Sequence, residues 1–253
     1  MLPRPNGLVA LLTDYGHTDP YVGILKGALL KASPKVQFVD VTHDVPAHDI
    51  DAGAFLLRTL VGRFPSGTVH LAVVDPGVGT SRRLLAVAAH DAYWIAPDNG
   101  LLAPLLVGDA AIDVRALDVE HLGLVAESAT FHGRDLLGPA AAMLAAGRFG
   151  FAALGPRVPD PVTTGDPFAG PPRVVHVDRF GNLVTNVRAG TAVAAVWIAG
   201  RRVPFAATYG AVAPGELLAY VGSFGLVEIA RNTGSAAAQL EVGRGAPIEL
   251  LPA

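Results

Sequence analysis

Short apolar runs and segments with helical spacing alternate along the first 75 residues, and this order restricts the possible folds more than any other feature. Strand-like apolar runs occupy residues 8–14, 36–45 and 68–75. The stretches between these runs carry apolar residues at helical spacing. A β-α-β-α-β order predicts parallel strands joined by right-handed crossovers. We therefore expect an α/β N-terminal domain with a mostly parallel central sheet.

Both helical segments have recognisable boundaries. Thr18 or Asp19 is expected to cap the first helix, with Pro20 at its first position. Pro34 closes that segment, and the second helix is expected over residues 51–64.

The composition and the spacing of apolar residues change after the middle of the chain. Residues 84–100 indicate a hairpin-like pair of strands, and residues 136–150 an Ala-rich helix. Pro and Gly then accumulate without periodicity, which is typical of a linker. Alternating apolar residues and turns follow, which predicts a compact all-β domain. The expected domains are an α/β domain at residues 1–155 and a smaller all-β C-terminal domain at residues 173–253, joined by a linker at residues 156–172.

Composition excludes several classes of function. The chain has no cysteine, which rules out disulfides, thiolate catalysis and cysteine-ligated metals. Its net charge is −3 with a pI of about 6.2, and it has no basic stripe, so neither nucleic acid nor an anionic membrane is expected as a partner. No segment has the pattern of a signal peptide or a membrane span, so a cytoplasmic protein is expected.

Two aspartates, Asp14 and Asp75, stand at the ends of predicted parallel strands. Ligands gather at this edge of such a sheet, whereas a single aspartate there usually caps a turn or helix. Two at equivalent positions favour a site. The turn after Asp75, "PGVGTSRR", lacks the spacing of a phosphate-binding loop and brings Arg82 seven residues later. His132 in "TFHGRD" precedes a predicted helix, where a structural role is the usual alternative.

Two other groups have open interpretations. His17, His43 and His48 lie among aspartates and raise the possibility of a metal-dependent hydrolase, although their spacing matches no compact ligand motif. In the second domain, the turn around Phe180 in "DRFGNLVTN" either clamps a flat heterocycle or serves only as a β-turn. The "GSFG" turn that begins at Gly222 has the same two interpretations.

Six segments together resemble the S-adenosylmethionine hydroxide adenosyltransferase family, which is related to the fluorinase and the chlorinase: "LLTDYGHTDPYVG", "VVDPGVGTSRR", "APDNG", "TFHGRD", "DRFGNLVTN" and "GSFGLVEIARNTGSA". The resemblance implies a homotrimer that holds its substrate between the first domain of one subunit and the second domain of its neighbour. It implies a catalytic set of Asp75, Arg82 and His132. The implied reaction hydrolyses S-adenosyl-L-methionine to adenosine and L-methionine by attack of activated water at ribose C5′, with no metal and no cofactor.

The resemblance also implies substrate-binding residues. Asp14 matches an acid that binds the ribose hydroxyls, and Phe131 matches an aromatic wall of the pocket. Phe180 and Asn182 match the groups that engage adenine from the neighbouring subunit, and Asp178 matches an acid that faces the methionine amino group. The remaining expected substrate-binding residues are Tyr220, Ser223, Glu228, Arg231 and Thr233.

Several positions separate this chain from the halogenating members that it resembles. Those enzymes do not keep the acid at Asp75 or the imidazole at His132. The fluorinase also has an added loop, a halide-holding serine where this chain has Gly133, and a tryptophan where it has His48. These differences favour water over halide as the nucleophile. The alternatives are a halide-dependent 5′-halo-5′-deoxyadenosine synthase and a non-catalytic protein that binds adenosine or S-adenosylmethionine.

Overall fold

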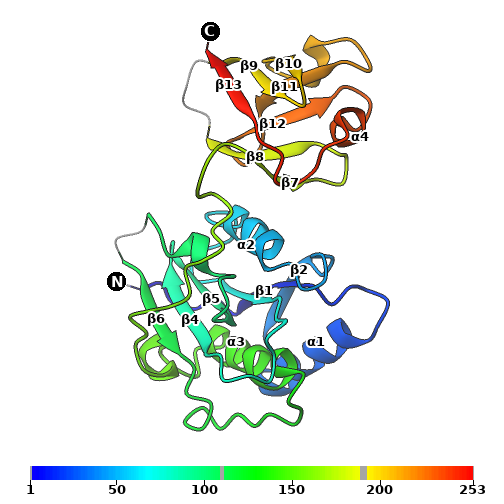
Figure 1. Cartoon of the computed structure of the whole chain (residues 1–253). Coiled ribbons are helices and arrows are strands. Elements are labelled where there is room, and N and C mark those ends of the chain that lie inside the picture. The colour runs from blue at the N-terminus through cyan, green and yellow to red at the C-terminus, as the bar shows by residue number, and fades with distance from the viewer. Residues whose placement is uncertain (1, 109–110, 189–192, 253) are drawn as a thin grey trace. The chain divides into compact units, whose positions relative to one another are not determined.

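The computed structural model describes residues 2–108, 111–188 and 193–252. The chain divides into two compact units, Met1–Asp166 and Pro167–Ala253 (Figure 1). The first unit combines a six-stranded sheet with helices, and the second contains two smaller sheets. Among the described residues, none of the helices has both the length and the apolar character that crossing a membrane requires.

The sheet of the first unit has the strand order β2-β1-β3-β5-β4-β6. Parallel pairing joins β1 to β2, β1 to β3 and β3 to β5, whereas β4 is antiparallel to both β5 and β6. The prediction of a mostly parallel sheet is confirmed, and the predicted hairpin is β4–β5. The strands are β1 (Leu8–Thr13), β2 (Gln37–Thr42), β3 (Val69–Val73), β4 (Leu84–Ala89), β5 (Ala92–Pro97) and β6 (Asp113–Ala116).

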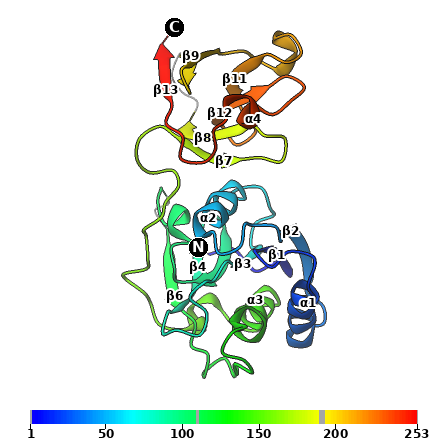
Figure 2. The same ribbon diagram turned by 45° about the vertical axis from the view of Figure 1, so that its right-hand side comes forward.

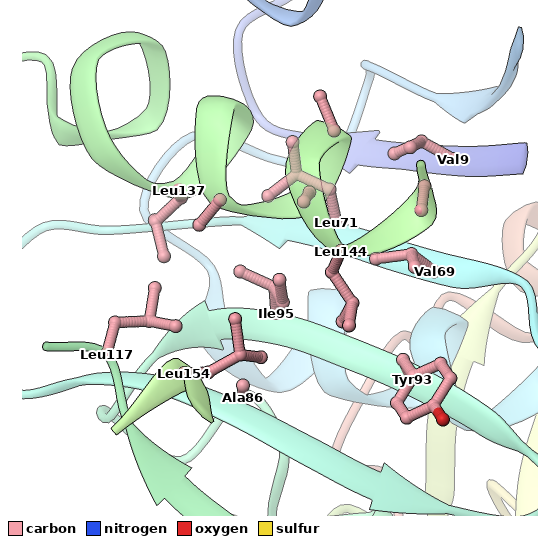
Figure 3. Close-up of a cluster of buried hydrophobic side chains, with 14 of the residues drawn as sticks. Val9, Val69, Leu71, Ala86, Tyr93, Ile95, Leu117, Leu137, Leu144 and Leu154 are labelled. Atoms are coloured by element: carbon pink, nitrogen blue, oxygen red, sulfur yellow. The ribbon is translucent and has the colours of Figure 1, made fainter. Parts of the chain in front are cut away.

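Helices cover both faces of this sheet, as the two views in Figure 1 and Figure 2 show. On one face, Leu25, Leu29 and Leu144 pack against side chains of the strands, and Figure 3 shows part of this cluster around Leu71. On the opposite face, Leu57 packs in a second cluster with other buried side chains of the sheet. The helices are α1 (Tyr21–Ala32) and α3 (Gly138–Ala145) on the first face and α2 (Ile50–Thr59) on the second.

Two predicted helix boundaries are wrong. Pro20 is itself the N-cap of α1, and its carbonyl accepts the first helical hydrogen bond from the Ile24 N–H, so neither Thr18 nor Asp19 caps the helix. The second helix begins at Ile50, one residue before its expected start, and the Asp49 side chain caps it by accepting from the Ala52 N–H. It ends at Thr59 rather than at residue 64, and turns follow it.

The predicted Ala-rich helix also begins differently. A π-helical turn, Gly133–Leu137, comes directly before α3, which ends at Ala145 rather than at residue 150. Such turns within helices are rare and frequently accompany functional sites. The first unit also contains the short 3₁₀ segments Ala103–Leu105 and Phe151–Leu154.

The second unit consists of a four-stranded sheet, β11-β12-β8-β7, and a three-stranded sheet, β10-β9-β13. Every pairing in these two sheets is antiparallel. The predicted β-type second region is therefore confirmed, with one five-residue helix, α4 (Ala236–Leu240), added to it. The strands are β7 (Val174–Val177), β8 (Leu183–Arg188), β9 (Val193–Ile198), β10 (Arg201–Pro204), β11 (Leu217–Val221), β12 (Leu226–Arg231) and β13 (Glu249–Pro252), and Tyr209–Ala211 forms a 3₁₀ turn.

Candidate active site

The two strand-end aspartates lie at the same edge of the sheet. β1 and β3 are parallel neighbours in register at Thr13 and Val73, so the residues that follow leave the sheet side by side. The backbone N–H of Asp14 donates to the carbonyl of Val73, at 3.4 Å. The carboxyl edge of the sheet is therefore the place where Asp14 and Asp75 approach each other.

The turn after β3 brings Arg82 back to Asp75. The Arg82 Nε–H donates to Asp75 Oδ1 at 2.7 Å, and its Nη2–H donates to Oδ2. This two-point contact is nearly buried, with 5% of the Asp75 side chain and 8% of the Arg82 side chain exposed. Gly79 makes the tight turn feasible, because it has a φ of +81° and an added Cβ would lie 2.6 Å from the Ala129 carbonyl oxygen.

His132 completes this cluster from the loop before the π-helical turn. Its Nδ1 lies 3.3 Å from both Nη atoms of Arg82. A guanidinium only donates hydrogen bonds, so Nδ1 is an acceptor and the proton of the neutral ring is on Nε2. Burial lowers the pKa of His132 below its ordinary value, and the positive charge of Arg82 lowers it further. The imidazole is therefore neutral at physiological pH.

A cavity of about 230 Å³ lies beside the cluster, and its lining includes Asp14, Asp75, Phe131 and His132. Eight lining residues were not among the predicted site residues, and four of these are Tyr15, Tyr21, Val78 and Thr130. The first two stand in the "TDYGHTDPYVG" segment and the last adjoins Phe131, so their sequence context already indicated this place. Val78 lies within the turn itself.

Aromatic rings form one side of the cavity. Tyr15, Tyr21 and Phe131 meet edge to face, with ring centroids 5.6–6.2 Å apart. Burial raises the pKa of Tyr15 above its ordinary value, and the charges of Asp14 and Asp75 raise it further, so its hydroxyl stays protonated. This wall is largely apolar with the hydroxyl groups of two tyrosines, which suits a flat or weakly polar ligand.

The Asp14 carboxylate is held by the backbone of His48. Its Oδ2 accepts a hydrogen bond from the His48 N–H at 2.9 Å, and His48 takes a left-handed φ of +66°. Both residues line the cavity. His48 therefore fixes an acid at the cavity through its backbone.

The other histidines do not gather into a metal site. The buried His43 side chain contacts Thr13 through Nδ1, at 2.8 Å, and Asp40 through Nε2, at 3.0 Å. His17 lies 3.8 Å from Asp44. Within residues 2–108, 111–188 and 193–252, no three His, Cys, Asp or Glu side chains are grouped as metal ligands.

The remaining predicted residues lie in the second unit, where Asp178 organises one turn. Its Oδ1 accepts from the N–H groups of Phe180 and Asn182, and its Oδ2 accepts from the Asn182 side-chain amide at 2.8 Å. Phe180 is 74% exposed, whereas Asn182 is buried. The turn thus presents an aromatic ring on a rigid base.

A second group in this unit surrounds Glu228. Its Oε2 accepts from the Tyr220 hydroxyl at 2.6 Å, and the Tyr209 hydroxyl lies 3.0 Å from that of Tyr220. Burial raises the pKa of Glu228, and the charge of Asp178 adds to this effect. Gly222 packs directly on this carboxylate.

The last three predicted residues lie in or after strands of this unit. Ser223 follows Gly222 in the turn between β11 and β12. The Arg231 Nε–H donates to the Gly215 carbonyl at 3.1 Å, and Thr233 takes a left-handed φ of +57°. The predicted catalytic set therefore forms one contact cluster in the first unit, and the residues predicted to contact adenine and methionine belong to the second.

Carboxylate, guanidinium and imidazole groups that meet at a cavity on the carboxyl edge of a parallel sheet define an enzyme of small-molecule chemistry. Matches to family models identify the family of this enzyme. The SAM hydroxide adenosyltransferase N-terminal domain matches residues 9–155, and the corresponding C-terminal domain matches residues 172–249. The chain belongs to the SAM hydroxide adenosyltransferase family.

Individual relatives agree with this family. A protein of Thermus thermophilus named (R)-S-adenosyl-L-methionine hydrolase is 39% identical over 96% of this chain and 99% of its own length. A solved structure of an uncharacterized conserved protein from Thermotoga maritima has a TM-score of 0.87, with 32% identity over 96% of this chain and 99% of that one. A fluorinase of Nocardia brasiliensis is more distant, at 26% identity over 96% of each chain.

Proposed function

We propose that this chain is an enzyme that hydrolyses S-adenosyl-L-methionine to adenosine and L-methionine. Water attacks ribose C5′, the C5′–O bond forms and the C5′–S bond breaks. The sulfur keeps the bonding electron pair and leaves as the neutral thioether of methionine, and the water gives up one proton. The observation that carries the proposal is the nearly buried Asp75–Arg82 pair, together with the contact of His132 with Arg82 beside the cavity.

The hydrogen bonds of the cluster suggest a role for each side chain. Each carboxylate oxygen of Asp75 has more than one acceptor site, so it can accept a hydrogen bond from water while it is paired with Arg82. The Nδ1 of His132 faces Arg82, which leaves the protonated Nε2 as a donor. We therefore assign Asp75 as the proton acceptor and His132 as the group that orients the water. A positioned base of this kind contributes about 10²–10⁴-fold to the rate.

Gly133, which follows His132 in the lining of the cavity, supports water rather than halide as the nucleophile. The resemblance places a halide-holding serine of the fluorinase where this chain has Gly133. A Cβ added at Gly133 would overlap the Tyr15 hydroxyl, so a serine there requires Tyr15 to move. The pocket is thus built around a residue without a side chain at that point.

The configuration at sulfur belongs to this proposal. The sulfonium sulfur carries three different carbon groups and is a stereocentre, and the Thermus relative is named for the R form. We propose the R epimer as the preferred substrate of this chain. With adenosine fixed and the C5′–S bond in line with the water, the two epimers differ in which direction the methyl group and the methionine chain leave the sulfur. A site that holds the methionine chain on one side therefore favours one epimer.

The proposal also includes the oligomeric state of the protein and its location in the cell. The predicted catalytic residues lie in the first unit, and the predicted adenine contacts Phe180 and Asn182 lie in the second. We propose a homotrimer in which each site joins the first domain of one subunit, residues 1–155, to the second domain of a neighbour, residues 173–253. The proposed linker is residues 156–172, the proposed location is the cytoplasm, and no cofactor takes part.

The test is product chromatography with each purified epimer of S-adenosylmethionine, with and without chloride and with and without EDTA. The expected result is adenosine and methionine in equal amounts from the R epimer, unchanged by EDTA. Release of a 5′-chloro nucleoside would support the halide-dependent alternative. Binding without turnover would identify a binding protein, and activity lost in EDTA and restored by zinc would contradict the metal-free scheme.

A further inference from the structure

The segment "APDNG" has no role in the proposed function, yet two of its residues contact Val74 and Arg83, which flank the turn formed by residues 75–82. Asp98 and Asn99 follow β5 directly. We propose that Asn99, Asp98 and Arg83 are positioning residues that hold the ends of this turn and so keep Asp75 in contact with Arg82. The inference rests on the assignment of the Asp75–Arg82 pair to the hydrolysis reaction.

Asn99 holds the beginning of the turn. Its side-chain amide donates to the carbonyl oxygen of Val74 at 2.9 Å, and its Oδ1 accepts from the Leu101 N–H at 3.2 Å. Val74 is fully buried, and its carbonyl belongs to the peptide that leads into Asp75. Fixing this peptide plane sets the direction in which the Asp75 side chain leaves the backbone.

Arg83 holds the end of the turn. Its Nε–H donates to Asp98 Oδ2 at 2.6 Å, and its carbonyl accepts from the Asp98 N–H at 3.0 Å. Arg83 therefore contacts Asp98 through both side chain and backbone. Adjacent side chains in an extended segment point to opposite sides. With Arg83 directed toward Asp98, Arg82 is left on the side of Asp75.

Arg83 and Asp98 also form hydrogen bonds with residues 160–162. The Arg83 Nη groups donate to the Asp160 carboxylate and carbonyl, both at 2.7 Å. The second oxygen of Asp98 accepts from the Val162 N–H at 2.8 Å, and only 4% of the Asp98 side chain is exposed. The Arg83 guanidinium and the Asp98 carboxylate are therefore both occupied, which leaves little freedom at the end of the turn.

A second arginine–aspartate ion pair in the first unit serves as a control for the Arg83–Asp98 pair. Arg115 pairs with Asp113 at 3.1 Å and donates to the carbonyls of Ala152 and Gly155. Both residues are in β6, an edge strand separated from β3 in the sheet order. Asp113→Asn therefore weakens a comparable ion pair without touching the 75–82 turn.

The experiment compares Asn99→Asp, Arg83→Met, Arg83→Lys and Asp113→Asn in the full-length chain. Asn99→Asp keeps the acceptor for Leu101 and removes the donor to Val74. Steady-state kinetics with S-adenosylmethionine give kcat and KM, thermal unfolding gives stability, and NMR titration follows the imidazole of His132, whose charged neighbours are Arg82, Asp75 and Asp135. The NMR measurement does not depend on turnover.

Asn99→Asp and Arg83→Met are expected to lower kcat by about 10–100-fold with KM changed less than about threefold, because a misplacement of about 1 Å costs roughly that much. Arg83→Lys is expected to recover part of kcat, and Asp113→Asn is expected to keep the wild-type value. In the two damaged variants, the pKa of His132 should return toward its ordinary value.

Wild-type kcat and an unchanged His132 titration in Asn99→Asp and Arg83→Met would overturn the proposal. An equal loss of kcat in Asp113→Asn would also overturn it, because the effect would then be general destabilisation. If wild-type protein fails to hydrolyse S-adenosylmethionine, the proposed function fails. The His132 titration still decides whether these residues hold Arg82 in place.

Discussion

Asp75 in the first unit and Glu228 in the second are both buried carboxylates among the predicted site residues, but their surroundings differ. Both oxygens of Asp75 accept from the Arg82 guanidinium. Glu228 accepts from the neutral hydroxyl of Tyr220 and lies near the like charge of Asp178. In the part of the chain that the structure describes, Glu228 forms no ion pair.

This difference in surroundings indicates that the two carboxylates have different roles. A buried carboxylate that is paired with a guanidinium is held by charge-assisted hydrogen bonds and remains available as an acceptor. A buried carboxylate without a cation is shifted toward its neutral form, and it then serves mainly as a hydrogen-bond partner. We therefore expect Asp75 to control the rate of the reaction, and Glu228 to control the stability of the second unit.

The largest effect is expected from Asp75→Asn, which keeps the shape of the side chain and removes its charge. The variant should lower kcat by about 10²–10⁴-fold, because the amide cannot accept the proton of the attacking water. Steady-state kinetics with S-adenosylmethionine measure this. Thermal unfolding and calorimetric binding of adenosine establish that the variant is folded, and a folded Asp75→Asn variant with wild-type kcat would remove Asp75 from the mechanism.

A smaller effect is expected from Phe180→Ala in the second unit. The exposed Phe180 ring does little for folding, whereas stacking between a base and an aromatic side chain contributes about 1–3 kcal/mol. KM should therefore rise about 5–150-fold with kcat nearly unchanged. Trp197, another exposed ring of the same unit, gives the matched control Trp197→Ala. An unchanged KM in Phe180→Ala would leave the "DRFGNLVTN" turn with a structural role only.

The contrast between the two carboxylates could be predicted only in part from the sequence. Strand-end position already predicts that Asp75 lies at the carboxyl edge of the sheet, because this feature is local, whereas the grouping of Asp75 with Arg82 was implied by the family resemblance. The tautomer of His132 and the link from Asn99 to Val74 depend on contacts between distant segments. The lack of a cation at Glu228 depends on which groups the folded sheet leaves nearby, which no spacing rule encodes.

Local rules also failed where a competing local group was present. The predicted cap of α1 at Thr18 or Asp19 is wrong because the carbonyl of Pro20 already accepts the first helical hydrogen bond. The segment that contains Tyr15 was identified, but Tyr15 itself was not among the predicted residues, because the approach of its hydroxyl to Gly133 joins positions far apart in the chain. The first failure thus comes from a local hydrogen bond, and the second from a contact between distant segments of the chain.

The smallest effect is expected from Glu228→Gln, and it is visible only as a function of pH. The folded pKa of Glu228 is raised above its ordinary value of 4.5, so above that pH the folded state binds more protons than the unfolded state. The free energy of unfolding of the wild type therefore falls as pH rises from 4.5 to the folded pKa, by at most about 1.4 kcal/mol per pH unit.

Glutamine removes this dependence while its carbonyl still accepts from Tyr220. The variant should gain stability over the wild type as pH rises through this window, and the difference should stay constant at higher pH. Urea unfolding from pH 4 to pH 8 measures it, with Glu249→Gln on the exposed side of β13 as the matched control. Because Asp75 does not change, kcat should remain near the wild-type value. A difference that shrinks with rising pH would mean that Glu228 gains a positive partner in the assembled enzyme, and the two carboxylates would then be alike.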